Sequence, residues 1–221
     1  MAAFWVGWPV TVKAIAAENL ACQRGGHVIV SGLSFEVRAG AALVLRGPNG
    51  SGKTTLLRTV AGYLTPASGG IRVIEADDFS ASTGEDGHFH YIGHANGIKT
   101  RLSVVENVCF WQRYYGGGEN LERAEVALDA FGLLNLADFR AAYLSQGQAR
   151  RLGLARLLAA RRPIWLLDEP SVSLDAASTR LLEHAVANHL ASSGLAIIST
   201  HLDLSLANAN TLELGSAPYL Q

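Results

Sequence analysis

Short runs of apolar residues recur along the chain and predict strands that are buried on both faces. They lie at Ala41–Leu45, Ile164–Leu167 and Ala196–Ser199. Strands inside a parallel sheet show such runs because helices cover both faces of the sheet. Apolar and polar residues alternate over Leu33–Val37, which predicts a strand with one exposed face. Ile71–Ile74 predicts a further short strand.

Helical spacing of apolar residues separates these strands. It occurs at Thr54–Ala61, Asn120–Phe131, Gln146–Ala160 and Ser178–Leu190. Buried strands that alternate with helices indicate an α/β fold with a parallel sheet. Residues 94–143 lack strand signals, so we expect a helical insertion there.

The composition excludes a disordered chain. Of 221 residues, 49% are hydrophobic and 17% are charged, against ~25% charged in an average soluble protein. This suggests that a partner covers some apolar surface. The net charge of −1 shows no overall basic field for nucleic acid. Cys22 and Cys109 form no close pair, which argues against a disulfide framework or zinc ribbon and fits a reducing compartment.

The N-terminus carries no charged side chain before Lys13. This run is shorter than the ~20 apolar residues that a bilayer span needs. We expect an N-terminal extension over residues 1–14 and one domain over residues 15–221. The extension is either loosely packed or makes a shallow membrane or partner contact through its aromatic side chains, which are Phe4, Trp5 and Trp8.

A glycine-rich loop between a predicted strand and a predicted helix carries the strongest chemical signal. It has the pattern Gly-x4-Gly-Lys-Thr, in which glycines let successive backbone amides face a phosphate. Lys53 would bridge β- and γ-phosphate oxygens, and the Thr54 hydroxyl would hold Mg²⁺. The expected ATP phosphate-binding residues are Gly47, Pro48, Asn49, Gly50, Ser51, Gly52, Lys53, Thr54 and Thr55.

Polar residues follow two of the buried strands. Asp168 comes at the carboxyl end of one strand, the edge where parallel sheets bind ligands, and would hold Mg²⁺ together with Thr54. Glu169 would orient or deprotonate the attacking water. His201 follows the last buried strand. It is either a hydrogen-bonding partner of the γ-phosphate and the water, or a solvated or capping histidine.

The pentapeptide LSQGQ precedes a predicted helix. Ser145 is a good N-cap residue and Gly147 permits close backbone approach, so this is either an anion site or an ordinary capped helix. The arginines of this region allow a nucleic-acid reading, but the apolar positions between them favour a packed helix. These arginines are Arg150, Arg151, Arg156, Arg161 and Arg162.

In this order, the phosphate loop, LSQGQ, the LLDEP run, SLD and His201 resemble the ATP-binding-cassette (ABC) ATPase family over about residues 20–201. The resemblance implies a P-loop NTPase with a RecA-like parallel-sheet core, an antiparallel β subdomain and an inserted α-helical lobe. It implies a homodimer that sandwiches two ATP molecules, with Asp175 in the loop SLD. The signature residues, which would act in trans, are Leu144, Ser145, Gln146, Gly147 and Gln148.

The chain departs from the family in three places. Gln146 stands where the family signature usually has a glycine, so its side chain would have to point away from phosphate. His94 stands where the family usually offers a glutamine to Mg²⁺. The adenine-stacking aromatic is absent near residues 22–26, where Arg24 or His27 would replace it.

Two stretches resemble a narrower family, the ATPase subunits of the haem exporters of cytochrome c biogenesis. They are residues 91–111 and SGLSFEV at residues 31–37. The resemblance implies a peripheral protein on the cytoplasmic side of a bacterial inner membrane, bound to small integral membrane subunits. It implies neither nucleic acid nor direct haem binding. The expected docking surface comprises Ile98, Leu102, Val105 and Phe110.

Three other readings compete with this one. The chain could serve another small-molecule or lipid ABC transporter, or it could be a soluble ABC module of DNA repair or translation. Such modules typically carry two cassettes, coiled coils or basic arms, which this chain lacks. A P-loop small-molecule kinase would have no role for LSQGQ or His201.

Overall fold

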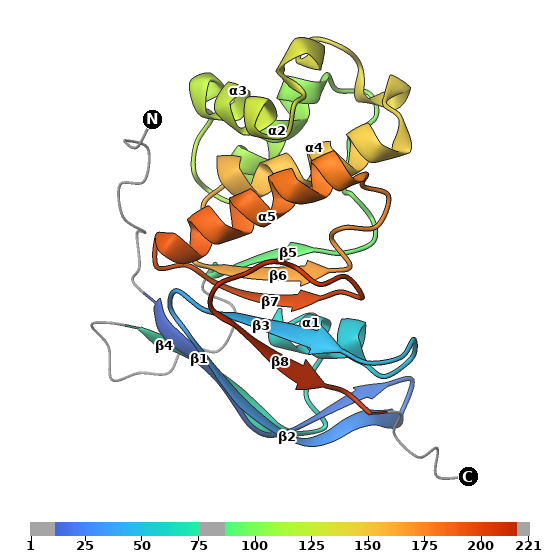
Figure 1. The fold of residues 1–221 in the computed structure, drawn as a ribbon, viewed down its shortest axis with the longest axis vertical. Coiled ribbons are helices and arrows are strands. Elements are labelled where there is room, and N and C mark those ends of the chain that lie inside the picture. The colour runs from blue at the N-terminus through green and yellow to red at the C-terminus, as the bar shows by residue number, and fades with distance from the viewer. Residues whose placement is uncertain (1–11, 76–86, 216–221) are drawn as a thin grey trace. The chain divides into compact units, whose positions relative to one another are not determined.

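The computed structural model describes residues 12–75 and 87–215, and the chain forms two compact units. The first unit comprises residues up to 91, residues 162–169 and residues from 189 onward. The second unit comprises residues 92–161 and 170–188. Figure 1 labels the helices and strands of both units.

An antiparallel sheet of three strands forms one part of the first unit. Its order is β2 (His27–Arg38), β1 (Val12–Arg24) and β4 (Ser68–Glu75). Strands β1 and β2 are joined by Gly25 and Gly26, which have φ of 59° and 82°. A two-residue hairpin turn with both residues at positive φ matches the twist of the flanking strands, and glycine adopts it without strain.

The second sheet of this unit has five strands. Their order is β5 (Phe89–Ile92), β6 (Ile164–Asp168), β7 (Leu195–Ser199), β3 (Ala42–Arg46) and β8 (Ala209–Glu213). The pairs β6–β7, β7–β3 and β3–β8 are parallel. Every residue of β6 and β7 is buried, which explains why both strands read as unbroken apolar runs.

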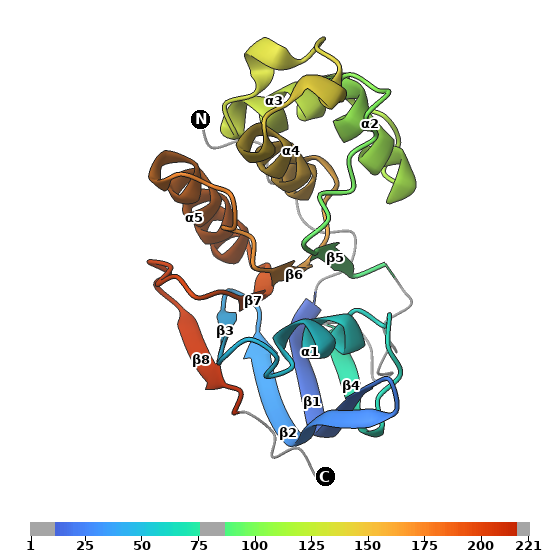
Figure 2. The ribbon, with the colours of Figure 1, turned by 90° about the vertical axis from the view of Figure 1, so that its right-hand side faces the viewer.

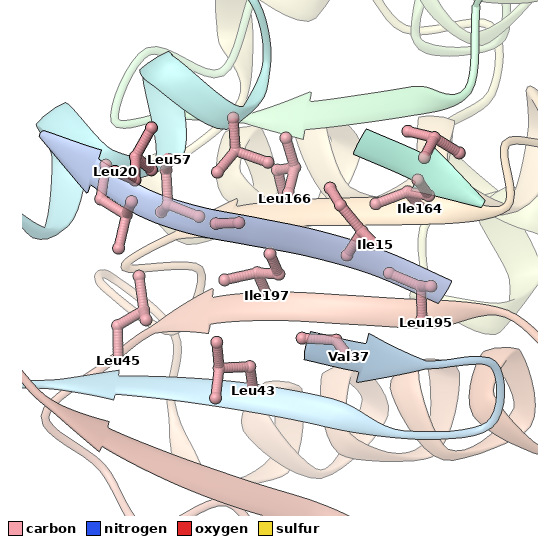
Figure 3. Close-up of a cluster of buried hydrophobic side chains, with 14 of the residues drawn as sticks. Ile15, Leu20, Val37, Leu43, Leu45, Leu57, Ile164, Leu166, Leu195 and Ile197 are labelled. Atoms are coloured by element: carbon pink, nitrogen blue, oxygen red, sulfur yellow. The ribbon is translucent and has the colours of Figure 1, made fainter. Parts of the chain in front are cut away.

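The core of the first unit lies where the two sheets and helix α1 (Lys53–Val60) meet (Figure 2). Ile15 of β1 and Leu43 of β3 belong to one cluster of buried side chains with Leu166 and Ile197 of the neighbouring strands (Figure 3). Leu57 of α1 joins the same cluster. The helix that follows the glycine-rich loop is therefore anchored to both sheets.

The second unit is helical. It contains α2 (Val104–Tyr114), α3 (Leu121–Ala130), η1 (Leu134–Leu136), η2 (Ala141–Tyr143) and α4 (Gln146–Ala159), which are seen together in Figure 2. Most of α5 (Ala176–Ala191) also belongs to it. None of the helices within residues 12–75 and 87–215 has the length and hydropathy that crossing a bilayer requires.

The predicted parallel sheet, antiparallel β subdomain and helical lobe are all present. Strand β1 was not predicted, because its buried positions do not alternate and residues 18–19 interrupt the apolar pattern. It begins at Val12, inside the segment assigned to the N-terminal extension. The helical unit extends beyond residues 94–143 and includes α4. Residues 1–11, with the aromatic side chains singled out above, lie outside the described residues.

His189, near the end of α5, is fully buried in the first unit. Its ring stacks on Trp165 at a centroid distance of 3.8 Å, and Nε2 donates to the Leu195 carbonyl at 3.1 Å. A Cβ atom on Gly194 would lie only 2.3 Å from this ring. Burial lowers the pKa of His189 to about 4, because the apolar surroundings disfavour the imidazolium.

We expect this histidine to make stability depend on pH. The unfolded chain binds the proton near pH 6.5 and the folded chain only near pH 4, so the unfolded state holds more protons between these values. The free energy of unfolding should therefore rise by about 3 kcal/mol from pH 4 to pH 6.5. Urea denaturation of the wild type and of His189→Phe measures this. Equal pH dependence in both proteins would contradict the assignment.

Candidate nucleotide-binding site

The glycine-rich loop connects buried strand β3 to helix α1. Gly47, Gly50 and Gly52 have φ of 138°, 86° and 100°, a region that residues with a Cβ rarely adopt. A Cβ on Gly47 would lie 2.3 Å from the Leu214 carbonyl oxygen, and one on Gly52 would lie 2.6 Å from Val30 Cγ2. At Gly47 and Gly52, a side chain is therefore excluded both by neighbouring atoms and by the backbone conformation.

Positive charge gathers at the start of α1. Gly52 is the N-cap residue, and the first turn contains no acidic side chain. Lys53 is buried, and its ammonium group donates to the carbonyls of Gly47 at 2.7 Å and Pro48 at 3.2 Å. A helix N-terminus with free amide groups and a lysine beside it attracts phosphate.

Asp168, at the end of β6, is 1% exposed and is surrounded by hydroxyl groups. Its Oδ1 accepts from Thr54 Oγ1 at 3.0 Å and from Ser199 Oγ at 2.8 Å. The Tyr91 hydroxyl faces Oδ2 at 3.4 Å. A carboxylate and a hydroxyl this close to the phosphate loop are the oxygen donors that Mg²⁺ prefers, so the residues present fit that ion.

Glu169 has a backbone conformation unusual for a residue with a side chain. Its φ is 47°, and its N–H is held by Ser199, 3.0 Å from the carbonyl oxygen and 3.1 Å from Oγ. His201 Nε2 lies 3.3 Å from Glu169 Oε1 and 3.3 Å from Asn49 Oδ1 of the loop. Both neighbours are oxygen atoms that accept hydrogen bonds, so the histidine must carry a hydrogen on Nε2 to donate to them. The histidine thus connects Glu169 to the phosphate loop.

The structure brings together the phosphate loop, Asp168, Glu169 and His201 in the first unit. Sequence reasoning missed Ser199, which hydrogen-bonds Asp168 and the Glu169 N–H, and Tyr91, whose hydroxyl faces Asp168. It also missed Arg58, whose pKa is raised by the nearby Tyr91. A hydroxyl at a strand end carries no signal in a single sequence. Only the pairing of β6 with β7 places Ser199 opposite Asp168.

The remaining predicted residues lie in the second unit. Ser145 starts α4 with a capping box: its Oγ accepts from the Gln148 N–H at 3.3 Å, and the Gln148 side chain accepts from the Ser145 N–H at 2.8 Å. Gln146 is exposed. A Cβ on Gly147 would lie 3.2 Å from the Ser173 carbonyl oxygen, so the backbone of residue 173 lies close to this glycine.

Asp175 and His94 are both exposed residues of this unit. Asp175 Oδ1 accepts from the Ser178 N–H at 2.7 Å, at the start of α5, and this hydrogen bond lowers the pKa of the carboxyl. His94 follows Gly93, whose carbonyl accepts from the buried Arg150 at 2.8 Å.

Arg150 and Arg156 are buried and have partners within the unit. Arg150 also donates to the Asn96 side chain at 3.0 Å and the Pro170 carbonyl at 3.0 Å. Arg156 lies over the Trp111 ring at 4.2 Å. These arginines hold loops in place, which favours the packed-helix reading of the sequence over the nucleic-acid reading.

A family model described as "ABC transporter" matches residues 30–172. The chain is 49% identical over 205 residues to the cytochrome c biogenesis ATP-binding export protein CcmA of Cereibacter sphaeroides, with 93% of this chain and 90% of the relative covered. It is 44% identical to the protein of the same name from Rhodopseudomonas palustris, with 92% and 98% covered. The chain belongs to the ABC transporter family, among the CcmA proteins.

Solved structures agree with this assignment of the cassette. A Pyrococcus furiosus structure described as an ABC transporter ATP-binding protein superposes with a TM-score of 0.79 at 26% identity, covering 91% of this chain and 97% of that one. The ADP conformation of another ATP-binding cassette superposes with a TM-score of 0.73 at 20% identity, covering 90% and 87%. The predicted P-loop NTPase fold and ABC ATPase family are confirmed.

Removal of the Ser199 hydroxyl should destabilise the cassette. In Ser199→Ala, Asp168 loses a donor in a buried position and the Glu169 N–H loses one of its two acceptors. We expect the free energy of unfolding to fall by about 1–3 kcal/mol in urea denaturation. Ser31→Ala, at an exposed position of β2, is the matched control and should change it by less than about 0.5 kcal/mol. Equal effects of the two variants would refute the role of this hydroxyl.

Proposed function

We propose that this ABC ATPase is the motor subunit of a cytochrome c biogenesis exporter that serves haem export or the release of a haem-loaded chaperone. The observation that carries the proposal is the single network that joins Thr54, Asp168 and Ser199 beside the phosphate loop. High identity to CcmA proteins over almost the whole chain supports the transport system.

The residues of the first unit suit the hydrolysis of ATP. The amides of the loop and the Lys53 ammonium would bind the β- and γ-phosphates and stabilise charge in the transition state. Glu169 would take a proton from the attacking water, whose oxygen bonds to the γ-phosphorus as the bond to the bridging oxygen breaks. His201 would donate Nε2–H to the γ-phosphate. The products are ADP and inorganic phosphate.

Thr54 and Asp168 would hold Mg²⁺ at this site. The ion would supply neutralisation of phosphate charge. The Thr54 hydroxyl and both carboxylate oxygens of Asp168 lie within one hydrogen-bonded cluster, which keeps the oxygen donors oriented. His94 stands where other cassettes offer a glutamine, so an imidazole would take the role of that glutamine here.

A second copy of the cassette would complete each site. The signature helix α4 begins with a capped N-terminus at Ser145, and Gly147 lies close to the backbone of the loop that contains Asp175. A helix N-terminus of this kind suits the γ-phosphate of ATP bound to the partner copy. ATP binding would close the homodimer, and hydrolysis would reopen it.

Closing and opening of the dimer would drive conformational changes in small integral membrane subunits bound to it. The cassette would then lie at the cytoplasmic face of the bacterial inner membrane. Four apolar side chains of the second unit are only partly buried and suit such a contact: Ile98, Leu102, Val105 and Phe110. An apolar fraction of 49% with few charged residues accords with a surface that a partner covers.

Substitutions in the hydrolytic site should separate binding from chemistry. Lys53→Ala removes the charge beside the loop, and we expect at least a tenfold loss of ATP affinity.

Glu169→Gln removes the base only, so ATP affinity should stay within about twofold of the wild type. Turnover should fall at least ~100-fold, and a closed dimer should accumulate. A fluorescent ATP analogue measures affinity, phosphate release measures turnover, and light scattering measures the dimer. Wild-type turnover in Glu169→Gln would exclude the assigned base.

Charge in the docking surface should release the cassette from membranes. Ile98→Glu and Leu102→Glu place a carboxylate in the proposed apolar contact, whereas the basal ATPase should persist. Val126→Glu, on the exposed side of α3, adds the same charge elsewhere in the same unit and is the control. Flotation of membranes from cells that express each variant measures the bound fraction. Unchanged association of the two docking variants would place the contact elsewhere.

Identification of the subunits that bind the cassette tests which transport system it serves. We expect short multi-span subunits of cytochrome c biogenesis to co-purify with the tagged cassette from detergent-solubilised membranes. Subunits of a lipid or small-molecule transporter would favour the first alternative. A cassette that stays with soluble partners would favour the soluble ABC module.

A further inference from the structure

Arg58 and Tyr91 form a row of side chains that leads from the surface of the first unit to Asp168. Arg58, on the exposed side of α1, lies near enough to Tyr91 for that side chain to raise the pKa of the guanidinium. The Tyr91 hydroxyl lies 3.4 Å from Asp168 Oδ2. These residues come from α1, β5 and β6. Arg58 lies outside the motifs quoted for the family, and Tyr91 is the first residue of the stretch 91–111 that resembles the narrower family.

The two carboxylate oxygens of Asp168 have different partners. Thr54 and Ser199 both donate to Oδ1, and the Tyr91 hydroxyl lies 3.4 Å from Oδ2. Since Asp168 is 1% exposed, bulk water does not readily replace a lost partner. A hydroxyl at each oxygen therefore contributes to the orientation of the carboxylate plane.

The position of the Tyr91 hydroxyl is set by the packing of its ring. The side chain is partly buried, and the ring makes an edge-to-face contact with Tyr63, at a centroid distance of 5.4 Å and an interplanar angle of 84°. This contact holds the hydroxyl beside Asp168 Oδ2.

We propose that Tyr91, supported by Arg58, is a positioning residue that orients Asp168 through Oδ2 and thereby sets the affinity of the nucleotide site for Mg²⁺. The inference rests on the proposed function, because it takes Asp168 as a holder of the ion. The role is one of geometry: Tyr91 touches neither the phosphates nor the ion and acts only through the carboxylate.

The test uses Tyr91→Phe in the full chain, because phenylalanine keeps the ring and its contact with Tyr63. Binding of a fluorescent ATP analogue is titrated with Mg²⁺ and repeated in EDTA. We expect the half-saturating Mg²⁺ concentration to rise about five- to tenfold, which lies within the net contribution of one ordinary hydrogen bond. Affinity in EDTA should remain within about twofold of the wild type.

Variants of Arg58 test its supporting role. Arg58→Gln removes the positive charge beside Tyr91 and should raise the half-saturating Mg²⁺ concentration about two- to threefold. Arg58→Lys keeps the charge and should restore part of this loss. Tyr114→Phe removes a hydroxyl from a side chain that is 67% exposed in the second unit, and it should leave the Mg²⁺ titration unchanged.

Two results would overturn the inference. One is a Mg²⁺ titration of Tyr91→Phe that matches the wild type. The other is an equal loss of nucleotide affinity with Mg²⁺ and in EDTA, together with a lower melting temperature, which would assign Tyr91 a purely structural role. Failure of the wild type itself to show Mg²⁺-dependent ATP binding would instead reject the proposed function, and this inference with it.

Discussion

The site depends on one buried carboxylate. Asp168 occupies the end of a strand whose five residues are all buried, where an unpaired charge would cost several kcal/mol. Hydroxyl groups from α1, β5 and β7 offset that cost at distances of 3.0, 3.4 and 2.8 Å. Each hydroxyl reaches the carboxylate only when its own element is correctly packed. The apolar core of the first unit and its polar site are therefore parts of one arrangement.

Neighbouring acidic residues serve different purposes because the backbone turns between them. Asp168 ends β6, and Glu169 takes a φ of 47°, which directs its side chain to His201 rather than to the hydroxyl cluster. Such a conformation costs of order 1–3 kcal/mol in a residue with a Cβ. Ser199 compensates by accepting the Glu169 N–H while it donates to Asp168. One serine thereby holds both acidic residues.

Hydrogen bonds from buried side chains to the backbone hold the second unit together. Its loops are fastened by buried polar side chains, above all Arg150 and Asn107. Asn107 exchanges two hydrogen bonds with the backbone of Lys99, at 2.7 and 3.0 Å, and thereby closes the segment 99–107, which contains Leu102 and Val105. Two capping boxes, at Ser103 and Ser145, define where α2 and α4 begin.

The sequence by itself determined the parallel sheet and the phosphate loop, because buried strands and glycine loops leave local patterns of residues. It also singled out Asp168, Glu169 and His201 as candidate site residues, because each follows a buried strand. Strand β1 and exposed edge strand β8 left no such pattern, since tertiary pairing rather than local alternation decides which of their residues are buried. The roles of Ser199, Tyr91 and Arg150 likewise came only from the tertiary structure. Their partners are 31, 77 and up to 57 residues away, and no local spacing encodes a contact that sheet pairing and helix packing create.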